Sequence, residues 1–154
     1  MTDEGVKLQG FSRVQIVEGK KIVGDSGWVG PNTVTNLGKQ HYLCELLAAE
    51  AASIQVGFMA LGIGTAPNAS HTHLDGEVMS STERVAIAYS NIASVTTEFQ
   101  GTFASGFVST TVTLQNIGLF DLSAEGSIFA GNVFASSQCA NNQAVYASYQ
   151  IRFT

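Results

Sequence analysis

The residues best suited to chemistry lie in one short segment, 71–77. Two imidazoles and two carboxylates alternate along it, at His71, His73, Asp75 and Glu77. On a strand these side chains would share one face and could converge on a divalent cation. Pro67, Asn68 and Gly76 instead indicate a loop, and no second cluster of ligand residues occurs elsewhere. We therefore expect no metal site, and keep these four residues only as metal-ligating candidates.

Other catalytic patterns are weaker. The turn Gly62-Ile63-Gly64-Thr65 follows an apolar run, but it lacks the Gly-Lys-Ser/Thr of a phosphate-binding loop, and no Gly-x-Ser-x-Gly occurs. Cys44 and Cys139 stand far apart, which excludes a Cys-x-x-Cys motif; we expect two buried thiols, with one long-range disulfide left open. We expect no enzyme and no cofactor.

Charge is scarce and unevenly distributed. Charged residues make up 12% of the 154 residues, against about 25% in a typical soluble domain. Five of the seven basic residues lie within the first 39 without forming a dense run, and the net charge is −5, which argues against nucleic-acid binding. No apolar run approaches the ~20 residues that span a bilayer. We also expect no signal peptide, because the first residues contain no apolar segment.

One long stretch lacks basic residues altogether. The 67 residues between Arg84 and Arg152 contain no Lys or Arg, and Glu98, Asp121 and Glu125 are their only charged residues. A surface so poor in charge is typical of one that other subunits cover. We therefore predict that an interface lies in this stretch.

The elements around these residues are mostly strands. Alternating or β-branched runs predict strands at 12–18, 21–24, 56–63, 83–89, 94–103, 107–114, 117–121, 127–135 and 144–153. Gly19 marks a hairpin turn between the first two, and 56–63 is apolar enough to be covered on both faces. Leucines at helical spacing predict one helix over 37–52. We expect a flexible N-terminal arm (1–11) and one domain (12–154), an antiparallel β-sandwich or jelly roll.

Aromatic residues supply candidates for the interface. Trp28 lies in a turn-rich connection, and most of the other aromatics lie on predicted strands. Such residues pack in a core or an interface more often than they line a ligand groove. Our interface candidates are Trp28, Phe99, Phe103, Phe107 and Tyr149.

Several short fragments follow one another along the chain: Ser26-Gly27-Trp28-Val29, Thr33-Val34-Thr35-Asn36, Met59-Ala60-Leu61-Gly62-Ile63-Gly64-Thr65, then Leu74, Glu77 and Arg84, and finally Ile117-Gly118-Leu119-Phe120-Asp121 and Ile128-Phe129-Ala130. In this order they resemble small virion proteins of tailed bacteriophages, of the capsid decoration (cement) or tail-associated kind. The resemblance implies a non-catalytic β-sandwich that binds the major capsid protein or other virion proteins as a homo-oligomer, often a trimer in cement proteins.

From this resemblance we expect a virion protein, assembled in the host cytoplasm, that stabilises the phage head by bridging neighbouring capsid subunits. Two alternatives remain open. One is a structural protein of the tail, baseplate or fibre. The other is a glycan-binding module that uses Trp28 together with the loop 64–77, and a host glycan is then a further partner.

Overall fold

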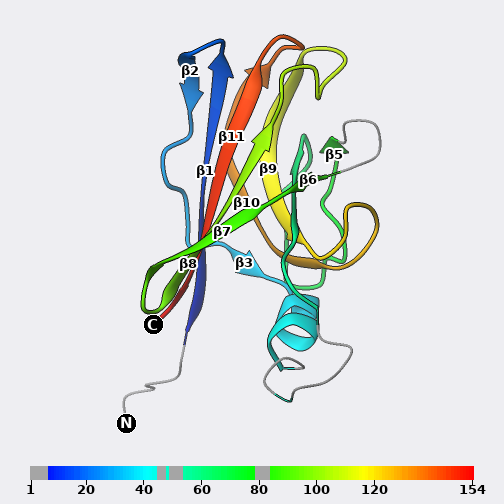
Figure 1. Ribbon diagram of the computed structural model, residues 1–154. Coiled ribbons are helices and arrows are strands. Elements are labelled where there is room, and N and C mark those ends of the chain that lie inside the picture. The colour runs from blue at the N-terminus through cyan, green and yellow to red at the C-terminus, as the bar shows by residue number, and fades with distance from the viewer. Residues whose placement is uncertain (1–6, 45–47, 49–53, 79–83) are drawn as a thin grey trace.

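A computed structural model of the chain describes residues 7–44, 48, 54–78 and 84–154. In these residues eleven strands and one short helix form two antiparallel sheets, which face each other across a shared apolar core (Figure 1). The protein is therefore mainly β, an antiparallel β-sandwich, as the sequence predicts. The jelly-roll form of its connections stays a prediction. No helix in the described part of the chain is long and apolar enough to cross a membrane.

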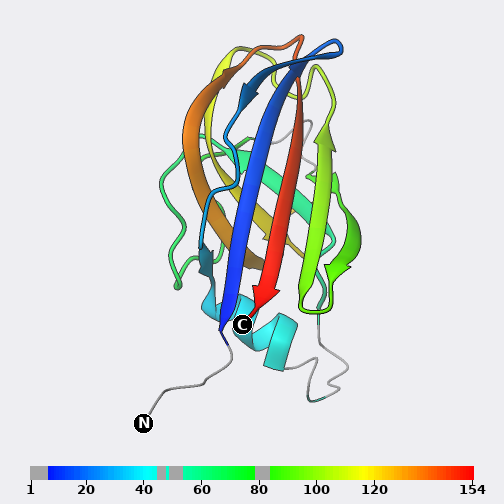
Figure 2. The ribbon, with the colours of Figure 1, turned by 90° about the vertical axis from the view of Figure 1, so that its left-hand side faces the viewer.

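Sheet A has five strands in the order β2-β1-β11-β8-β7, and Figure 2 looks onto it, with β2 at one border and β7 at the other. The strands are β1 (Leu8–Glu18), β2 (Lys21–Asp25), β7 (Ala88–Ala93), β8 (Thr96–Phe103) and β11 (Ala144–Phe153). Gly19 has a φ of 63° in the turn between β1 and β2, a conformation that glycine adopts without steric cost. The predicted hairpin is confirmed.

Sheet B has the order β3-β10-β9-β4-β5, with β6 also pairing with β4. Its strands are β3 (Thr33–Val34), β4 (Phe58–Gly62), β5 (Glu77–Val78), β6 (Val85–Ala86), β9 (Val112–Phe120) and β10 (Ile128–Cys139). The runs 107–114 and 117–121, predicted as two strands, overlap the single strand β9, and residues 107–111 precede it as a non-strand segment. Its buried Asn116 does not interrupt pairing, because its amide donates to the backbone oxygens of Thr65 and Asp75 at 3.0 and 2.8 Å.

The core forms where the inner faces of the two sheets meet. Along β11 the inward residues Val145, Ala147, Tyr149 and Ile151 are all buried, as the period of two in a strand requires. Opposite them, β4 and β9 contribute Met59, Leu61, Leu114, Ile117 and Leu119, each with no exposed surface. The alternation in 144–153 therefore predicts the buried face of β11 correctly.

The outer face of sheet B is also covered. Ala60, Phe120 and Ile128 form a second buried cluster with Leu74, which comes from the polar loop between β4 and β5. A loop that looks solvated in sequence thus contributes an apolar side chain to a small second core. This confirms that β4 is apolar because both its faces are covered.

The helix differs from its prediction. Helix η1 (Gly38–Cys44) is of the wide π type, and residues 45–47 and 49–53 of the predicted helix lie outside the described residues. The Thr35 hydroxyl accepts a hydrogen bond from the Gly38 amide and donates to the Ile128 carbonyl, which ties the start of η1 to β10. A side chain at position 38 would meet the Phe129 carbonyl oxygen, so glycine is required there.

The N-terminal boundary also needs correction. Strand β1 begins at Leu8 and pairs with β11 as far as Phe153, and the backbones of Lys7 and Thr154 exchange two hydrogen bonds. Residues 8–11, predicted as part of a flexible arm, therefore belong to sheet A. The remainder of the predicted arm, 1–6, lies outside the described residues.

Candidate interaction surface

Strand β7 forms one border of sheet A, and all six of its residues are exposed. Tyr89 is 71% exposed, Ile92 50% and Val95, in the turn that follows, 53%. The chain carries no charged residue from Val85 to Thr97. This border therefore combines an unpaired backbone edge with uncharged and partly apolar side chains.

Burial falls steadily along one row of residues that crosses sheet A. The register places Ser12 opposite Tyr149, Tyr149 opposite Phe99, and Phe99 opposite Tyr89. Residues directly opposite each other share a face, so Tyr89 points to the inner side as Tyr149 does. Tyr149 is fully buried and Phe99 is half-buried. The described part of sheet B thus covers β11 but leaves β7 uncovered.

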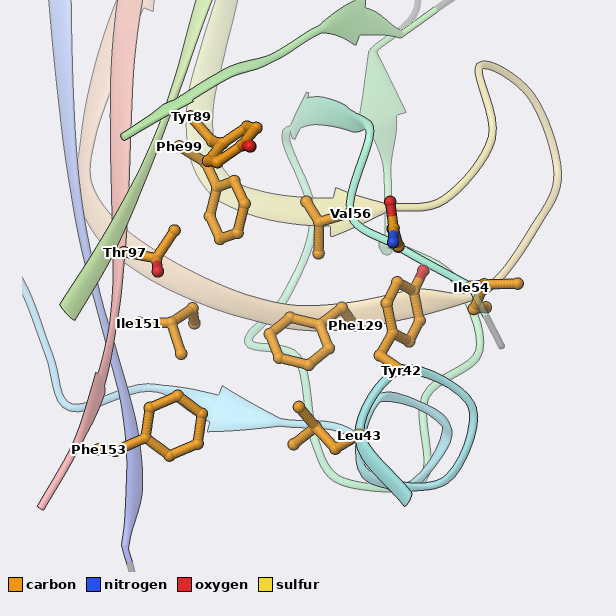
Figure 3. A pocket seen from close by; sticks show the side chains of 11 residues that line it. Tyr42, Leu43, Ile54, Val56, Tyr89, Thr97, Phe99, Phe129, Ile151 and Phe153 are labelled. Atoms are coloured by element: carbon orange, nitrogen blue, oxygen red, sulfur yellow. The ribbon is translucent and has the colours of Figure 1, made fainter. Parts of the chain in front are cut away.

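An apolar groove of about 390 Å³ opens beside this border (Figure 3). It lies between the inner side of β7, β8 and β11 and the helix η1. Its eleven lining residues are all uncharged types: Tyr42, Leu43, Ile54, Gln55, Val56, Tyr89, Thr97, Phe99, Phe129, Ile151 and Phe153. A groove of this kind favours apolar or aromatic groups, because a charge placed there would lose hydration without gaining an opposite partner.

The far wall of the groove is held firmly in place. The Tyr42 hydroxyl donates a hydrogen bond to the Ser127 carbonyl, and its ring lies 5.0 Å from the ring of Phe129 at a tilt of 55°. Burial raises the pKa of Tyr42 far above its ordinary value, so this hydroxyl stays protonated at neutral pH. The groove therefore has one fixed aromatic wall, facing the exposed ring of Tyr89.

A buried cation lies at the start of the uncharged stretch. The Arg84 side chain, 3% exposed, pairs with Glu77 through Nε and Oε1 at 2.6 Å. Its Nη1 donates to the carbonyls of Leu122 and Glu125 at 3.0 and 2.5 Å, and its guanidinium lies 3.4 Å above the Phe120 ring. Arg84 therefore joins β5 to the β9–β10 turn. This role was not predicted from the sequence, although Arg84 directly precedes the uncharged segment 85–97.

Of the four metal-ligating candidates, the two carboxylates bond to residues outside the segment 71–77 and the two imidazoles stack on each other. The Asp75 carboxylate accepts bonds from the Thr65 amide and hydroxyl at 2.8 and 2.9 Å, and these bonds hold the pKa of Asp75 below its ordinary value. Glu77 pairs with Arg84. The rings of His71 and His73 stack with centroids 6.4 Å apart. Among the described residues, no group of three or more His, Cys, Asp or Glu side chains is arranged to hold a metal ion.

The five interface candidates divide into two groups. Trp28 is 43% exposed and Phe99 lines the groove. Phe103, Phe107 and Tyr149 are 3%, 7% and 0% exposed and belong to the main core. Their prediction as interface residues is corrected here: strand periodicity marks the apolar face, but it does not distinguish a face covered by the other sheet from one left open.

The cysteines are both free. Cys139 is buried in the core, as expected, and burial raises the pKa of its thiol. Cys44 is exposed at the end of η1, contrary to expectation. Its predicted burial depended on the general tendency of free cysteine to be buried, and the end of a short helix does not provide that burial here.

No protein-family model, no curated protein and no solved structure matches this chain. Tyr89 is the most exposed large apolar residue in the described part of the chain. It was not among the five predicted interface residues. The signal that could have found it is its position on an alternating strand within a long uncharged stretch.

Proposed function

We propose that the protein is a non-enzymatic virion structural protein, a capsid decoration or cement protein that stabilises a phage head by bridging neighbouring capsid subunits. The observation that carries the proposal is the uncharged border at β7. Tyr89, Ile92 and Val95 are each at least half exposed there within seven residues, and no charge accompanies them. Several large apolar side chains exposed near one another in an uncharged segment are typical of protein interfaces.

Apolar contact suits a protein that binds a repeating lattice. Burial contributes about 25 cal/mol for each Å² of apolar surface removed from water. Several modest contacts, made together by a homo-oligomer such as the proposed trimer, reinforce one another through a high effective concentration. Such binding does not depend on opposite charges, which agrees with a stretch of 67 residues that has no Lys or Arg.

Two of the three charged side chains in this stretch, Glu98 and Asp121, are already hydrogen-bonded. The Glu98 carboxylate accepts bonds from the side-chain amides of Gln100 and Gln150 at 2.7 and 2.8 Å. Asp121 accepts a bond from the Ser127 amide at 2.7 Å. A partner that covers this side of the molecule would therefore not isolate a bare carboxylate at either position, which lowers the cost of burial.

Binding to empty heads that lack the protein tests the proposal. We expect the purified chain to bind such heads and raise their melting temperature, and Tyr89→Ser to weaken binding by at least about tenfold, because the ring no longer buries apolar area. Ile22→Ser is the matched control, since Ile22 is 52% exposed on the opposite border. Equal loss in both variants, or no binding by the wild type, contradicts the proposal; binding to tails alone favours the tail alternative.

The glycan-binding alternative is supported by one observation. Trp28 exposes 43% of its surface in the connection after β2, and an exposed tryptophan offers a flat apolar face to a sugar ring. A glycan array with wild type and Trp28→Ala tests it. Specific sugar binding that disappears in Trp28→Ala favours the glycan module, and incorporation into particles without sugar binding favours cement.

A further inference from the structure

Strand β7 presents an unprotected edge. It pairs with β8 on one side and with no described strand on the other. Natural proteins protect such edges with charged residues, proline or bulges, because free backbone groups pair readily with another strand. No charged residue or proline occurs from Val85 to Thr97. The single irregularity falls between Asn91 and Ala93, which leaves Ala88–Asn91 as a regular segment open to pairing.

We propose that this edge pairs with the same edge of a second copy of the chain, antiparallel and across a twofold axis. A strand reserved for a different protein needs a feature that rejects its own copy, most simply a charge, since like charges meet in a self-paired strand. Strand β7 has no such feature. A second copy is also present wherever the protein is made, at the same concentration.

The alternation of β7 limits the register. Tyr89 and Asn91 face inward and Ser90 faces outward, as their partners Phe99, Thr97 and Glu98 show. Inward residues meet inward residues only if the twofold axis passes through a residue position of β7. An axis at Ser90, within the regular segment, sets Tyr89 opposite the second copy's Asn91.

This arrangement would cover both the free backbone edge of β7 and the exposed ring of Tyr89. The two five-stranded sheets join into one continuous sheet of ten strands. The ring of Tyr89, 71% exposed in one copy, then lies at the junction where the two grooves meet. Both contacting edges are uncharged, so pairing brings no charge out of water.

The nearest charge does not oppose the contact. Glu98 lies on β8, one strand inward. Two such carboxylates would be separated by three strand spacings, or roughly 14 Å, which exceeds the distance of about 8 Å over which salt screens charges. Each is also hydrogen-bonded to Gln100 and Gln150.

The mass of the purified chain tests the proposal without any virion component. A twofold contact pairs each copy with one other copy, so monomers become dimers, and trimers become hexamers or, if the twofold axes miss the threefold axis, larger assemblies. In sedimentation velocity we expect the Ser90→Lys variant to have at most half the mass of the wild type and to associate at least about tenfold more weakly, because two ammonium groups would lie directly opposite each other. The matched control Val23→Lys, on the opposite border and 45% exposed in the native side chain, leaves the mass unchanged.

Disulfide trapping gives a second measurement. Cys44 is exposed, so the variants are made in a Cys44→Ser background. We expect oxidised Ser90→Cys to form a covalent pair much faster than Val23→Cys at the same concentration, because only the first thiol lies beside its copy on the axis.

Three outcomes overturn the proposal: a wild type that sediments at the same mass as Ser90→Lys, equal trapping of the two cysteine variants, or loss of head binding in Ser90→Lys with its mass unchanged. The last outcome assigns the edge to a strand of another protein. Because mass and trapping are measured without heads, a failure of the cement function would not imitate a failure of this contact.

Discussion

The two borders of sheet A differ in charge more than in apolar exposure. On β2, Ile22 and Val23 are 52% and 45% exposed, values comparable to those of Ile92 and Val95 beside β7. Strand β2 nevertheless carries Lys21 and Asp25, and its register with β1 shifts between Ile16 and Val17. Charged residues on an edge strand resist the addition of another strand. The β7 edge, with similar apolar exposure and no charge, lacks this protection.

Two ion pairs among the described residues differ in exposure. Arg13 and Asp25, on β1 and β2, have side chains 37% and 33% exposed and an N–O contact of 2.6 Å. Glu77, on β5 of sheet B, and Arg84, just before β6, are 14% and 3% exposed at the same distance. The first pair remains at the surface, and the second lies within the fold.

The largest expected effect comes from breaking the buried pair. Arg84→Met should lower the free energy of unfolding by about 3–5 kcal/mol, because it strands the Glu77 carboxylate in a poorly hydrated site and removes a donor to two carbonyls. Urea denaturation measures the loss. Arg13→Met, at the exposed pair, should cost much less, because solvent screens its charge. Similar losses in the two variants would remove the contrast between the two pairs.

Removing the hydroxyl groups of two buried tyrosines, Tyr149 and Tyr42, should change the stability of the fold in opposite directions. The Tyr149 hydroxyl is buried without a hydrogen-bond partner in the described structure, whereas the Tyr42 hydroxyl donates to Ser127. An unpaired buried hydroxyl is costly and a satisfied one is favourable, each by about 1 kcal/mol. We expect Tyr149→Phe to raise the urea midpoint and Tyr42→Phe to lower it. A lower midpoint in Tyr149→Phe would show that its hydroxyl has a partner in solution.

The smallest expected effect is the pH dependence of the exposed pair. The hydrogen bond from Arg13 holds the pKa of Asp25 far below its ordinary value. Because the folded-state pKa is lowered, the pair's contribution is complete above the unfolded value of about 4 and is lost as the pH falls through the folded-state pKa. The small difference in stability between wild type and Arg13→Met at pH 7 should therefore shrink further in strong acid. Urea midpoints at several pH values check this, and a constant difference would argue against it.

The sequence was sufficient where periodicity and turn chemistry agree. The alternation of 144–153 predicts β11 and its buried face, and Gly19 predicts the hairpin of β1 and β2. It was insufficient where a tertiary contact decides. The burial of Phe103 and Phe107 depends on the opposite sheet, and the exposure of Tyr89 depends on where that sheet ends.

The roles of the polar residues in 71–77 also depend on tertiary contacts. The segment 71–77 combines imidazoles and carboxylates, yet Asp75 and Glu77 bond to Thr65 and Arg84, which lie outside it. Leu74, the one apolar residue among them, anchors the loop to sheet B. Only the fold reveals that these side chains serve the loop's attachment.

The buried thiol of Cys139 can serve as a chemical probe for local opening of the core around β10. It has no exposed surface, at the end of β10 within the stretch that lacks Lys and Arg, while Cys44 is exposed. A thiol reagent should modify Cys44 at once and reach Cys139 only when β10 separates from the core. The ratio of the two rates then measures the free energy of that local opening in the native sequence, before and after the chain meets its partners.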